Sequence, residues 1–318
     1  MSNKNLNLKS NDVNLSQKSK IGCHFSNGFK KVIGNKTFTH KDKEGIMLII
    51  LIIIFSVLIV YKKYKLSVII FLFIINFIYS DPLRIIYPFS YLISLKTKNY
   101  PYLNRKKVFP SYIDFENTSN FKKIKKEVVN YLENYDKAFI DTRDSFDSET
   151  NRYIGGGDKS VGKNWKISTI LIGNKFSKLA KKKLPYLVRL LKKNSNIVSC
   201  AISLLPAKKA IPIHVGYFKG VLRYQLAITV PKDRKNVFIC VNGEKYSWKE
   251  GEGVLFDDMY PHKVYNNTDE KRVVLYMDVK RPLNNCFYNS IINFIVKLIS
   301  GTNISKNELK RTEYLVKL

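Results

Sequence analysis

Two long apolar runs dominate the amino-terminal third of this chain. Residues 46–61 read IMLIILIIIFSVLIVY and residues 66–79 read LSVIIFLFIINFIY, separated by the basic break Lys62-Lys63-Tyr64-Lys65. Each run is slightly shorter than the roughly 20 residues that cross a bilayer. They predict either a tight two-pass hairpin of tilted helices or a single anchor followed by a helix in the membrane interface. The alternative is a buried helical hairpin of a soluble protein.

The charge of the chain also favours a membrane. The formal net charge is +30 over 318 residues, and a charge of this size favours anionic partners such as phospholipid head groups or nucleic acid. The sequence has no zinc-finger, RNP-like or helix-turn-helix pattern, so we expect no nucleic acid. The Lys-rich tail before the first run and the basic residues 96–107 both favour the cytoplasmic side of a membrane, which a two-pass hairpin satisfies.

Composition and periodicity divide the chain into six segments. We expect a disordered basic tail at 1–45, a membrane anchor of one or two helices at 46–80 and a proline-rich linker at 81–110. A helical and loop region follows at 111–196, with helices at 115–135 and 175–193, a loop at 141–162 and a strand at 165–172. A barrel core is expected at 197–283 and a helical tail at 284–318.

The barrel core is predicted from a change to a period of two. Strands are expected at 197–205, 222–230, 236–241, 245–248, 253–256, 263–265 and 272–279, separated by polar turns. Short strands joined by such turns indicate an antiparallel barrel or jelly roll. The predicted fold class is therefore mainly β with flanking helices, preceded by an amino-terminal transmembrane anchor.

Two histidines lie within this core. His214 follows a proline-containing loop, 206–213, and His262 comes 48 residues later. Adjacent strands can bring two such imidazoles to one metal, and imidazole suits iron, zinc, copper and nickel alike. The alternative is that each histidine is a structural residue.

Three motifs surround these histidines. They are HVGYFKGVLRYQL at 214–226, YSWKEGEGVLFDDMYPH at 246–262 and NNTDEKRVVL at 266–275, followed by Asp278 and Arg281-Pro282-Leu283. In this order they resemble the aspartyl/asparaginyl β-hydroxylase family over about 90 residues, and more loosely upstream to Trp165. With an amino-terminal anchor, the arrangement looks most like the membrane-anchored lipid A hydroxylases of that family.

The resemblance implies a cupin-like double-stranded β-helix that uses Fe(II) and 2-oxoglutarate. It matches His214 and His262 to the iron ligands and Arg272 to the arginine that binds the distal carboxylate of 2-oxoglutarate. A guanidinium fork suits that carboxylate because it can bind both oxygens. The remaining residues that the resemblance assigns to 2-oxoglutarate binding are Trp165, Ser203, Arg223, Tyr224 and Gln225.

Two positions depart from the family pattern. Gly216 stands where most such oxygenases have a carboxylate ligand, although the animal branch of the family also has glycine there. Gln225 stands where members usually have histidine. Asp257 and Asp258 are candidate replacement ligands, and the alternative that we favour is that they orient His262 or cap the turn.

The resemblance therefore implies a 2-oxoglutarate-dependent dioxygenase, with its catalytic domain on the cytoplasmic side. Molecular oxygen would be a substrate, and the hydroxylated C–H bond would lie in a protein Asp or Asn side chain or in a membrane-lipid acyl chain. The competing interpretations are a catalytically degenerate binding module on a membrane tether and a barrel that uses a different metal, such as zinc or nickel.

Overall fold

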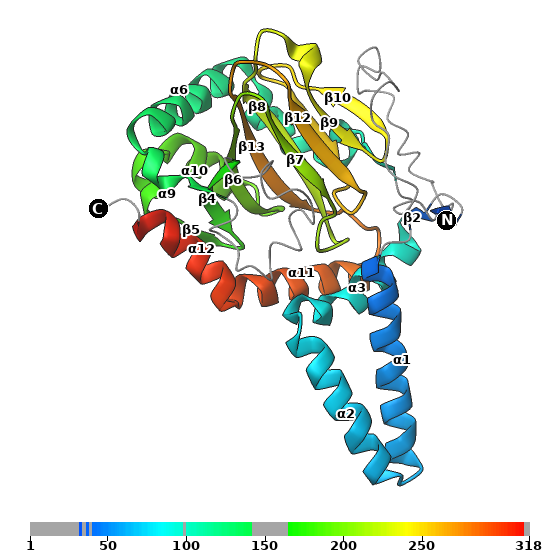
Figure 1. Cartoon of the computed structure of the whole chain (residues 1–318). Coiled ribbons are helices and arrows are strands. Elements are labelled where there is room, and N and C mark those ends of the chain that lie inside the picture. The colour runs from blue at the N-terminus through cyan, green and yellow to red at the C-terminus, as the bar shows by residue number, and fades with distance from the viewer. Residues whose placement is uncertain (1–31, 34–35, 38–39, 98–99, 142–164, 315–318) are drawn as a thin grey trace. The chain divides into compact units, whose positions relative to one another are not determined.

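The structure is a computed structural model that describes residues 32–33, 36–37, 40–97, 100–141 and 165–314 (Figure 1). The chain forms two compact units. The larger contains Tyr100–Gly216 and Val221–Leu318, and the smaller contains Phe25–Asn99 with Tyr217–Gly220. Most of the predicted disordered tail and of the predicted loop at 141–162 lies outside the described residues.

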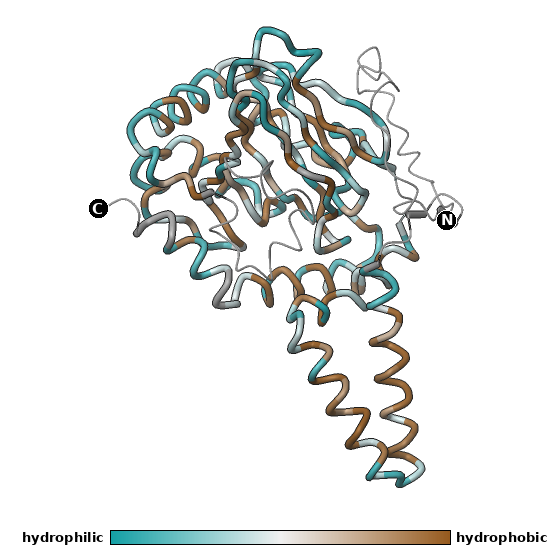
Figure 2. Tube along the Cα trace, viewed as in Figure 1, coloured by the Kyte–Doolittle hydropathy of each residue, from teal (hydrophilic) through white to brown (hydrophobic). Residues whose placement is uncertain are grey.

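The smaller unit is built on the two apolar runs. They form helices α1 (His40–Val60) and α2 (Tyr64–Tyr79), after a short hairpin of β1 (Val32–Ile33) and β2 (Lys36–Thr37). The chain turns between the helices at Lys62, whose φ is 55°. The Phe55 and Phe71 rings pack at 5.9 Å between centroids. Both helices are apolar over most of their length (Figure 2), and α1 becomes so after its polar first residues, 40–44. The predicted helices are confirmed.

Helix α1 has the length and composition of a membrane span. Only 11% of the residues in its most apolar 18-residue stretch are buried, and large apolar side chains such as Ile53 and Val60 are exposed. Helix α2 is shorter and bends by 110° into η3 (Pro82–Ile86) and α3 (Tyr87–Lys96). Within the described residues there is thus one helix able to cross a membrane, or two if the bent pair counts as one span. Use of these helices as an anchor stays a prediction.

The larger unit contains two antiparallel sheets. A 7-stranded sheet has the order β11-β8-β13-β6-β4-β3, with β5 paired to β4, and a 4-stranded sheet has the order β10-β9-β12-β7. The strands are β3 (Ile140–Asp141), β4 (Lys166–Ile172), β5 (Lys175–Phe176), β6 (Ile197–Leu205), β7 (Lys209–His214), β8 (Val221–Thr229), β9 (Val237–Val241), β10 (Glu244–Ser247), β11 (Gly253–Phe256), β12 (His262–Asn266) and β13 (Arg272–Lys280).

Every strand predicted from the period of two is present within a residue or so of its expected bounds. The turn between β9 and β10 has positive φ at Asn242 and Gly243, as a tight two-residue hairpin turn requires. The prediction of a loop at 206–213 is wrong for most of its length, because β7 forms there. This strand carries Pro212 and lies at the edge of its sheet, where a residue without a backbone N–H is tolerated.

Helices flank the sheets, as predicted. They are α4 (Arg105–Val108), η4 (Pro110–Tyr112), α5 (Ile113–Glu116), α6 (Thr118–Asn134), η5 (Asp136–Ala138), α9 (Lys178–Lys183), α10 (Pro185–Lys193), α11 (Cys286–Gly301) and α12 (Asn303–Tyr314). The helix predicted at 115–135 is divided at Asn117, whose side chain caps α6 by accepting from the backbone N–H groups of Ser119 and Asn120.

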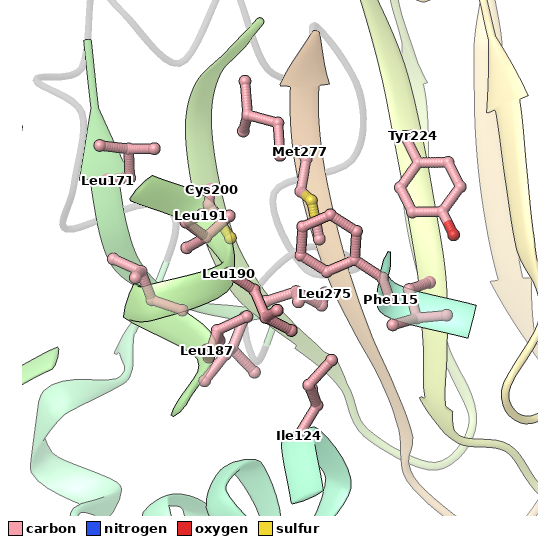
Figure 3. Close-up of a cluster of buried hydrophobic side chains, with 14 of the residues drawn as sticks. Phe115, Ile124, Leu171, Leu187, Leu190, Leu191, Cys200, Tyr224, Leu275 and Met277 are labelled. Carbon is pink, nitrogen blue, oxygen red and sulfur yellow. The ribbon is translucent and has the colours of Figure 1, made fainter. Parts of the chain in front are cut away.

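Two apolar clusters hold this unit together. One lies between the larger sheet and the helices and contains Leu187, Leu190, Leu275 and Met277 (Figure 3). The other lies between the two sheets and contains Trp248, Ile239 and Val274. Residues alternate between the two clusters along β13, so every second side chain of that strand points into the space between the sheets.

Candidate active site

The two core histidines face each other across neighbouring strands. His214 is the last residue of β7 and His262 is the first of β12, and the two are paired in the antiparallel register. Their ring centroids are 4.1 Å apart. His262 is 2% exposed, whereas His214 is partly exposed. The fold thus brings together two residues that are 48 positions apart in sequence.

The orientation of His262 suits a metal ligand. Its Nδ1 lies 2.9 Å from the backbone carbonyl oxygen of Tyr260. A carbonyl oxygen can only accept, so Nδ1 carries the proton and Nε2 keeps its lone pair. Backbone carbonyls commonly fix metal-binding imidazoles in this way. The described residues contain no group of three or more His, Cys, Asp or Glu side chains that could hold a metal, so the candidate donors in this part of the structure are the two imidazoles.

Gly216 and Asp258 share one small volume beside this pair. A Cβ atom added to Gly216 would lie 2.4 Å from the Asp258 carboxyl carbon. The Gly216 N–H also donates to the Asp258 carbonyl oxygen at 2.6 Å. Asp258 is 1% exposed, and its carboxylate lies 3.2 Å from a terminal nitrogen of Arg223. The Asp258 carboxylate therefore fills the space that a side chain at position 216 would need.

Asp257 serves the turn before His262. One carboxylate oxygen accepts from the Met259 N–H at 3.1 Å, and the other forms a buried ion pair of 2.7 Å with Arg281. These contacts are those of a turn-capping residue, which was the alternative favoured for this position.

Arg272 is a buried cation for which the described residues supply no ion pair. It is 1% exposed, and its Nε and one terminal nitrogen have no hydrogen-bond partner among the described residues. Burial lowers the pKa of Arg272 to about 9. Its guanidinium lies over the Trp248 ring, 4.8 Å from the centroid. Since an unpaired buried charge is costly, this position fits an arginine that awaits an anionic ligand.

Ser203, Trp165 and Gln225 add polar groups to the same larger unit. The Trp165 indole N–H donates to the Ser203 hydroxyl at 2.9 Å, and the Trp165 ring lies 6.3 Å from that of His214. The Gln225 side-chain oxygen is buried without a partner among the described residues. Ser203 lies on β6 and Gln225 on β8, the two strands that flank β13.

Arg223 and Tyr224 lie differently from what the sequence suggested. Arg223 is held between Asp278 at 2.9 Å and Asp258 at 3.2 Å. Tyr224 belongs to the cluster on the helical side of the sheet (Figure 3), and its hydroxyl donates to Glu116 at 2.8 Å. Strand alternation turns Tyr224 away from its neighbours Arg223 and Gln225. The structure thus places Tyr224 on the opposite face of β8 from Arg223 and Gln225, and its role in cosubstrate binding stays a prediction.

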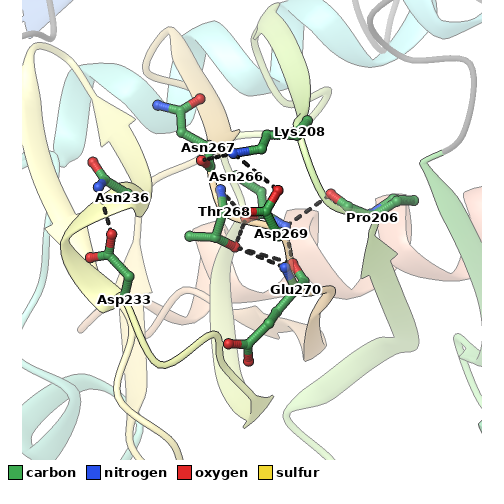
Figure 4. Close-up of polar contacts among 9 residues, drawn as sticks. All are labelled: Pro206, Lys208, Asp233, Asn236, Asn266, Asn267, Thr268, Asp269 and Glu270. Carbon is green, nitrogen blue, oxygen red and sulfur yellow. Dashed lines mark hydrogen bonds and ion pairs between the residues drawn. The ribbon is translucent and has the colours of Figure 1, made fainter.

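A turn with two buried polar side chains, Asn266 and Thr268, fixes the spacing between β12 and β13. The Asn266 amide donates to the carbonyl oxygens of Pro206 at 2.9 Å and Glu270 at 2.8 Å, and the Thr268 hydroxyl donates to the Asn266 side chain at 2.6 Å (Figure 4). Asn266 is completely buried. It thus joins the strand that begins at His262 to the strand that begins at Arg272, a structural role that no sequence motif indicated.

Comparison with known proteins identifies this arrangement. The model of the aspartyl/asparaginyl beta-hydroxylase family matches residues 118–282, more than half of the chain. The chain belongs to this family. The resemblance inferred from the motifs at 214–226, 246–262 and 266–275 is thereby confirmed.

Several curated proteins share part of the sequence of this family member. An ornithine lipid ester-linked acyl 2-hydroxylase of Rhizobium tropici is 37% identical over 87 residues, which cover 27% of this chain and 31% of that protein. The aspartyl/asparaginyl beta-hydroxylase of Mus musculus is 32% identical over 69 residues, which cover 22% of this chain and 9% of that protein. The chain therefore matches a third or less of the length of these relatives.

Solved structures that match this β-hydroxylase family member are distant. A DMSP lyase from Ruegeria pomeroyi has a TM-score of 0.28 and 12% identity, and covers 41% of this chain and 54% of that chain. A predicted oxalate decarboxylase from Thermotoga maritima has a TM-score of 0.25 and 15% identity, and covers 36% and 80%. Both TM-scores are low, and the fold description rests on the strand order given above.

Proposed function

We propose that this chain is an Fe(II)- and 2-oxoglutarate-dependent dioxygenase that hydroxylates an aliphatic C–H bond. The observation that carries the proposal is the presence of two facing imidazoles and one buried, unpaired guanidinium in the same two-sheet unit. The family membership agrees with it, because the curated relatives are named as hydroxylases.

The strand order supports a double-stranded β-helix. The eight strands from β6 to β13 divide into the orders β11-β8-β13-β6 and β10-β9-β12-β7. Two facing four-stranded antiparallel sheets connected in this way are a jelly roll. In this interpretation, His214 and His262 lie on the smaller sheet and Arg272 on the larger one, so a small ligand between the sheets can meet all three.

His214 and His262 would hold the iron, which supplies the oxygen activation that no side chain offers. The fixed Nδ1 proton of His262 directs Nε2 toward a metal. Imidazole is a suitable donor for Fe(II), and an iron held by only these two side chains of the described residues could also bind 2-oxoglutarate and oxygen. Asp258, which takes the place of a carboxylate at 216, keeps a negative charge close to the pair.

Arg272 would bind the distal carboxylate of 2-oxoglutarate. The guanidinium offers at least two nitrogens that have no partner among the described residues, and a carboxylate accepts two parallel hydrogen bonds from such a fork. Ser203, Gln225 and Trp165 would complete the cosubstrate pocket. Arg223 would contribute to the pocket indirectly, through its ion pairs with Asp258 and Asp278.

We favour a membrane-associated substrate, such as a lipid acyl chain, over a protein Asp or Asn side chain. Helix α1 is long and apolar enough to cross a bilayer and exposes its apolar side chains. The Rhizobium relative is named for hydroxylating a lipid-linked acyl chain. We propose a membrane location with the catalytic unit on the cytoplasmic side, since the basic residues that flank the apolar runs favour that side.

Succinate release tests this function directly. The purified full chain in detergent should convert 2-oxoglutarate to succinate only when Fe(II) and oxygen are present, and His262→Ala should abolish the conversion. Mass spectrometry of lipids and peptides from cells with and without the protein should show a gain of one oxygen atom in a product.

A second candidate function is a binding module that has lost catalysis. It is favoured by Gly216, which supplies no carboxylate ligand, and by Gln225 in place of the usual histidine. Binding of 2-oxoglutarate without any succinate formation would support it. Copurified zinc, together with no response of the metal site to 2-oxoglutarate, would overturn the oxygenase proposal.

A further inference from the structure

Trp248 is a core residue that also reaches the buried arginine. It follows β10 and is fully buried in the cluster between the two sheets. Tyr246 packs edge-on against it at 6.4 Å between centroids. The Arg272 guanidinium covers the Trp248 ring at 4.8 Å, within the range of a cation–π contact. The ring is thus the neighbour of Arg272 that partly replaces a missing counter-charge.

The indole N–H of Trp248 is buried without a hydrogen-bond partner among the described residues. Buried tryptophan N–H groups usually have a partner, and that of Trp165 has one in Ser203. A position that needed only apolar packing would be filled as well by phenylalanine. The unused donor of Trp248 therefore calls for an acceptor that this described part of the chain does not provide.

Other unpartnered polar atoms lie at the same end of the two-sheet unit. The Arg272 Nε and one of its terminal nitrogens are among them, and so is the Thr229 hydroxyl. Thr229 pairs with Val273, the residue next to Arg272 on β13. These donors include a cation, and together they match the two oxygens of one carboxylate.

We propose that Trp248 positions the anionic end of the cosubstrate, with its ring supporting the Arg272 guanidinium and its indole N–H donating to the carboxylate that Arg272 binds. This inference rests on the proposed function and deepens it. It assigns Trp248 two separable tasks. Substitution by phenylalanine keeps a ring beneath the guanidinium and removes only the N–H donor, whereas substitution by leucine removes both.

Glutarate is a suitable probe, because it has the two carboxylates of 2-oxoglutarate but lacks the keto oxygen that would chelate a metal. Its binding to the metal-free full chain in detergent, measured by titration calorimetry, reports on the anion end alone. Trp248→Phe should weaken glutarate binding about 10- to 150-fold, the loss expected for one hydrogen bond to a charged group. Trp248→Leu should weaken it further. The neighbouring variant Tyr246→Phe is the matched control and should bind within about 2-fold of the parent chain.

A second measurement does not need a Trp248 variant to fold. The chain has two tryptophans, so in Trp165→Phe the fluorescence of Trp248 is the sole indole signal. Glutarate binding by this variant is first measured by calorimetry, and at saturating glutarate the Trp248 emission should change. Glutarate binding that is unchanged in Trp248→Phe, or a Trp248 emission that ignores bound glutarate, would overturn the role of Trp248. Failure of the proposed function looks different: the parent chain would bind neither glutarate nor 2-oxoglutarate.

Discussion

The unpaired charge of Arg272 leads to an unusual expectation for Arg272→Met. Burial moves the pKa of this arginine from 12.5 to about 9, which corresponds to about 5 kcal/mol of folding free energy at about 1.36 kcal/mol per pH unit. The cation–π contact with the Trp248 ring offsets about 1–2 kcal/mol of this cost. Imperfect filling of the space by methionine costs about 1 kcal/mol. The substitution should therefore stabilise the ligand-free protein by about 2 kcal/mol, while it abolishes binding of 2-oxoglutarate.

Thermal unfolding of the full chain in detergent is the assay. A gain of about 2 kcal/mol should raise Tm by about 4–8 °C for a unit of this size. When burial lowers the pKa of a base, the protonated base destabilises the folded state by its full amount at every pH below the folded-state pKa. The advantage of Arg272→Met should thus be constant from pH 7 to about 9 and shrink at higher pH, because the folded parent chain then releases the proton.

Two comparisons make the result decisive. Arg272→Lys keeps a charge at the same place and should not stabilise the protein. Saturating 2-oxoglutarate should raise the Tm of the parent chain and leave Arg272→Met unchanged. If Arg272→Met unfolds at a lower temperature than the parent chain, the arginine has a partner in solution, and the inference of an empty anion site is refuted.

Three further outcomes are expected. His262→Ala should remove measurable Fe(II) binding in anaerobic metal analysis, because it deletes one of the two proposed imidazole donors. Gly216→Ala should cost about 1–3 kcal/mol through overpacking against the Asp258 carboxylate, and the double variant with Asp258→Gly should recover part of the lost Tm. Arg281→Met should lower the free energy of unfolding by about 3–5 kcal/mol, because it removes the cation paired with the fully buried Asp257 carboxylate. A Tm within about 2 °C of the parent chain would contradict this.

The strands of the larger unit were accessible from sequence because their apolar residues alternate. The exceptions were β7 and the two-residue strands β3 and β5, and β5 lies at the start of the segment that was predicted to be a helix at 175–193. β7 contains Pro212, and a proline in a sequence often indicates a loop. Only the strand order shows that this segment lies at a sheet edge, where proline is tolerated. Alternation also explains why Tyr224 lies on the opposite face from Arg223 and Gln225. A motif matched along the chain assigns consecutive residues to one pocket, but a strand sends every second side chain to the opposite face.

The candidate site was predictable in its residue types and less so in its contacts. The motifs suggested His214, His262 and Arg272, and the fold brings the two histidines together. Their facing depends on pairing between strands distant in sequence. The unused N–H of Trp248 was not foreseeable, because a sequence gives no information on whether a buried donor finds an acceptor.

The shared volume of Gly216 and Asp258 restricts how this protein can change during evolution. An acid at position 216 would have to occupy the space that Asp258 already fills. A single mutation to Asp or Glu at position 216 would make its side chain overlap sterically with the buried Asp258 carboxylate. Residue 258 would therefore first have to become smaller. Homologues are therefore expected to carry a small residue at one of the two positions whenever the other is acidic, and an ancestor that passed between the two states must have lacked both acids.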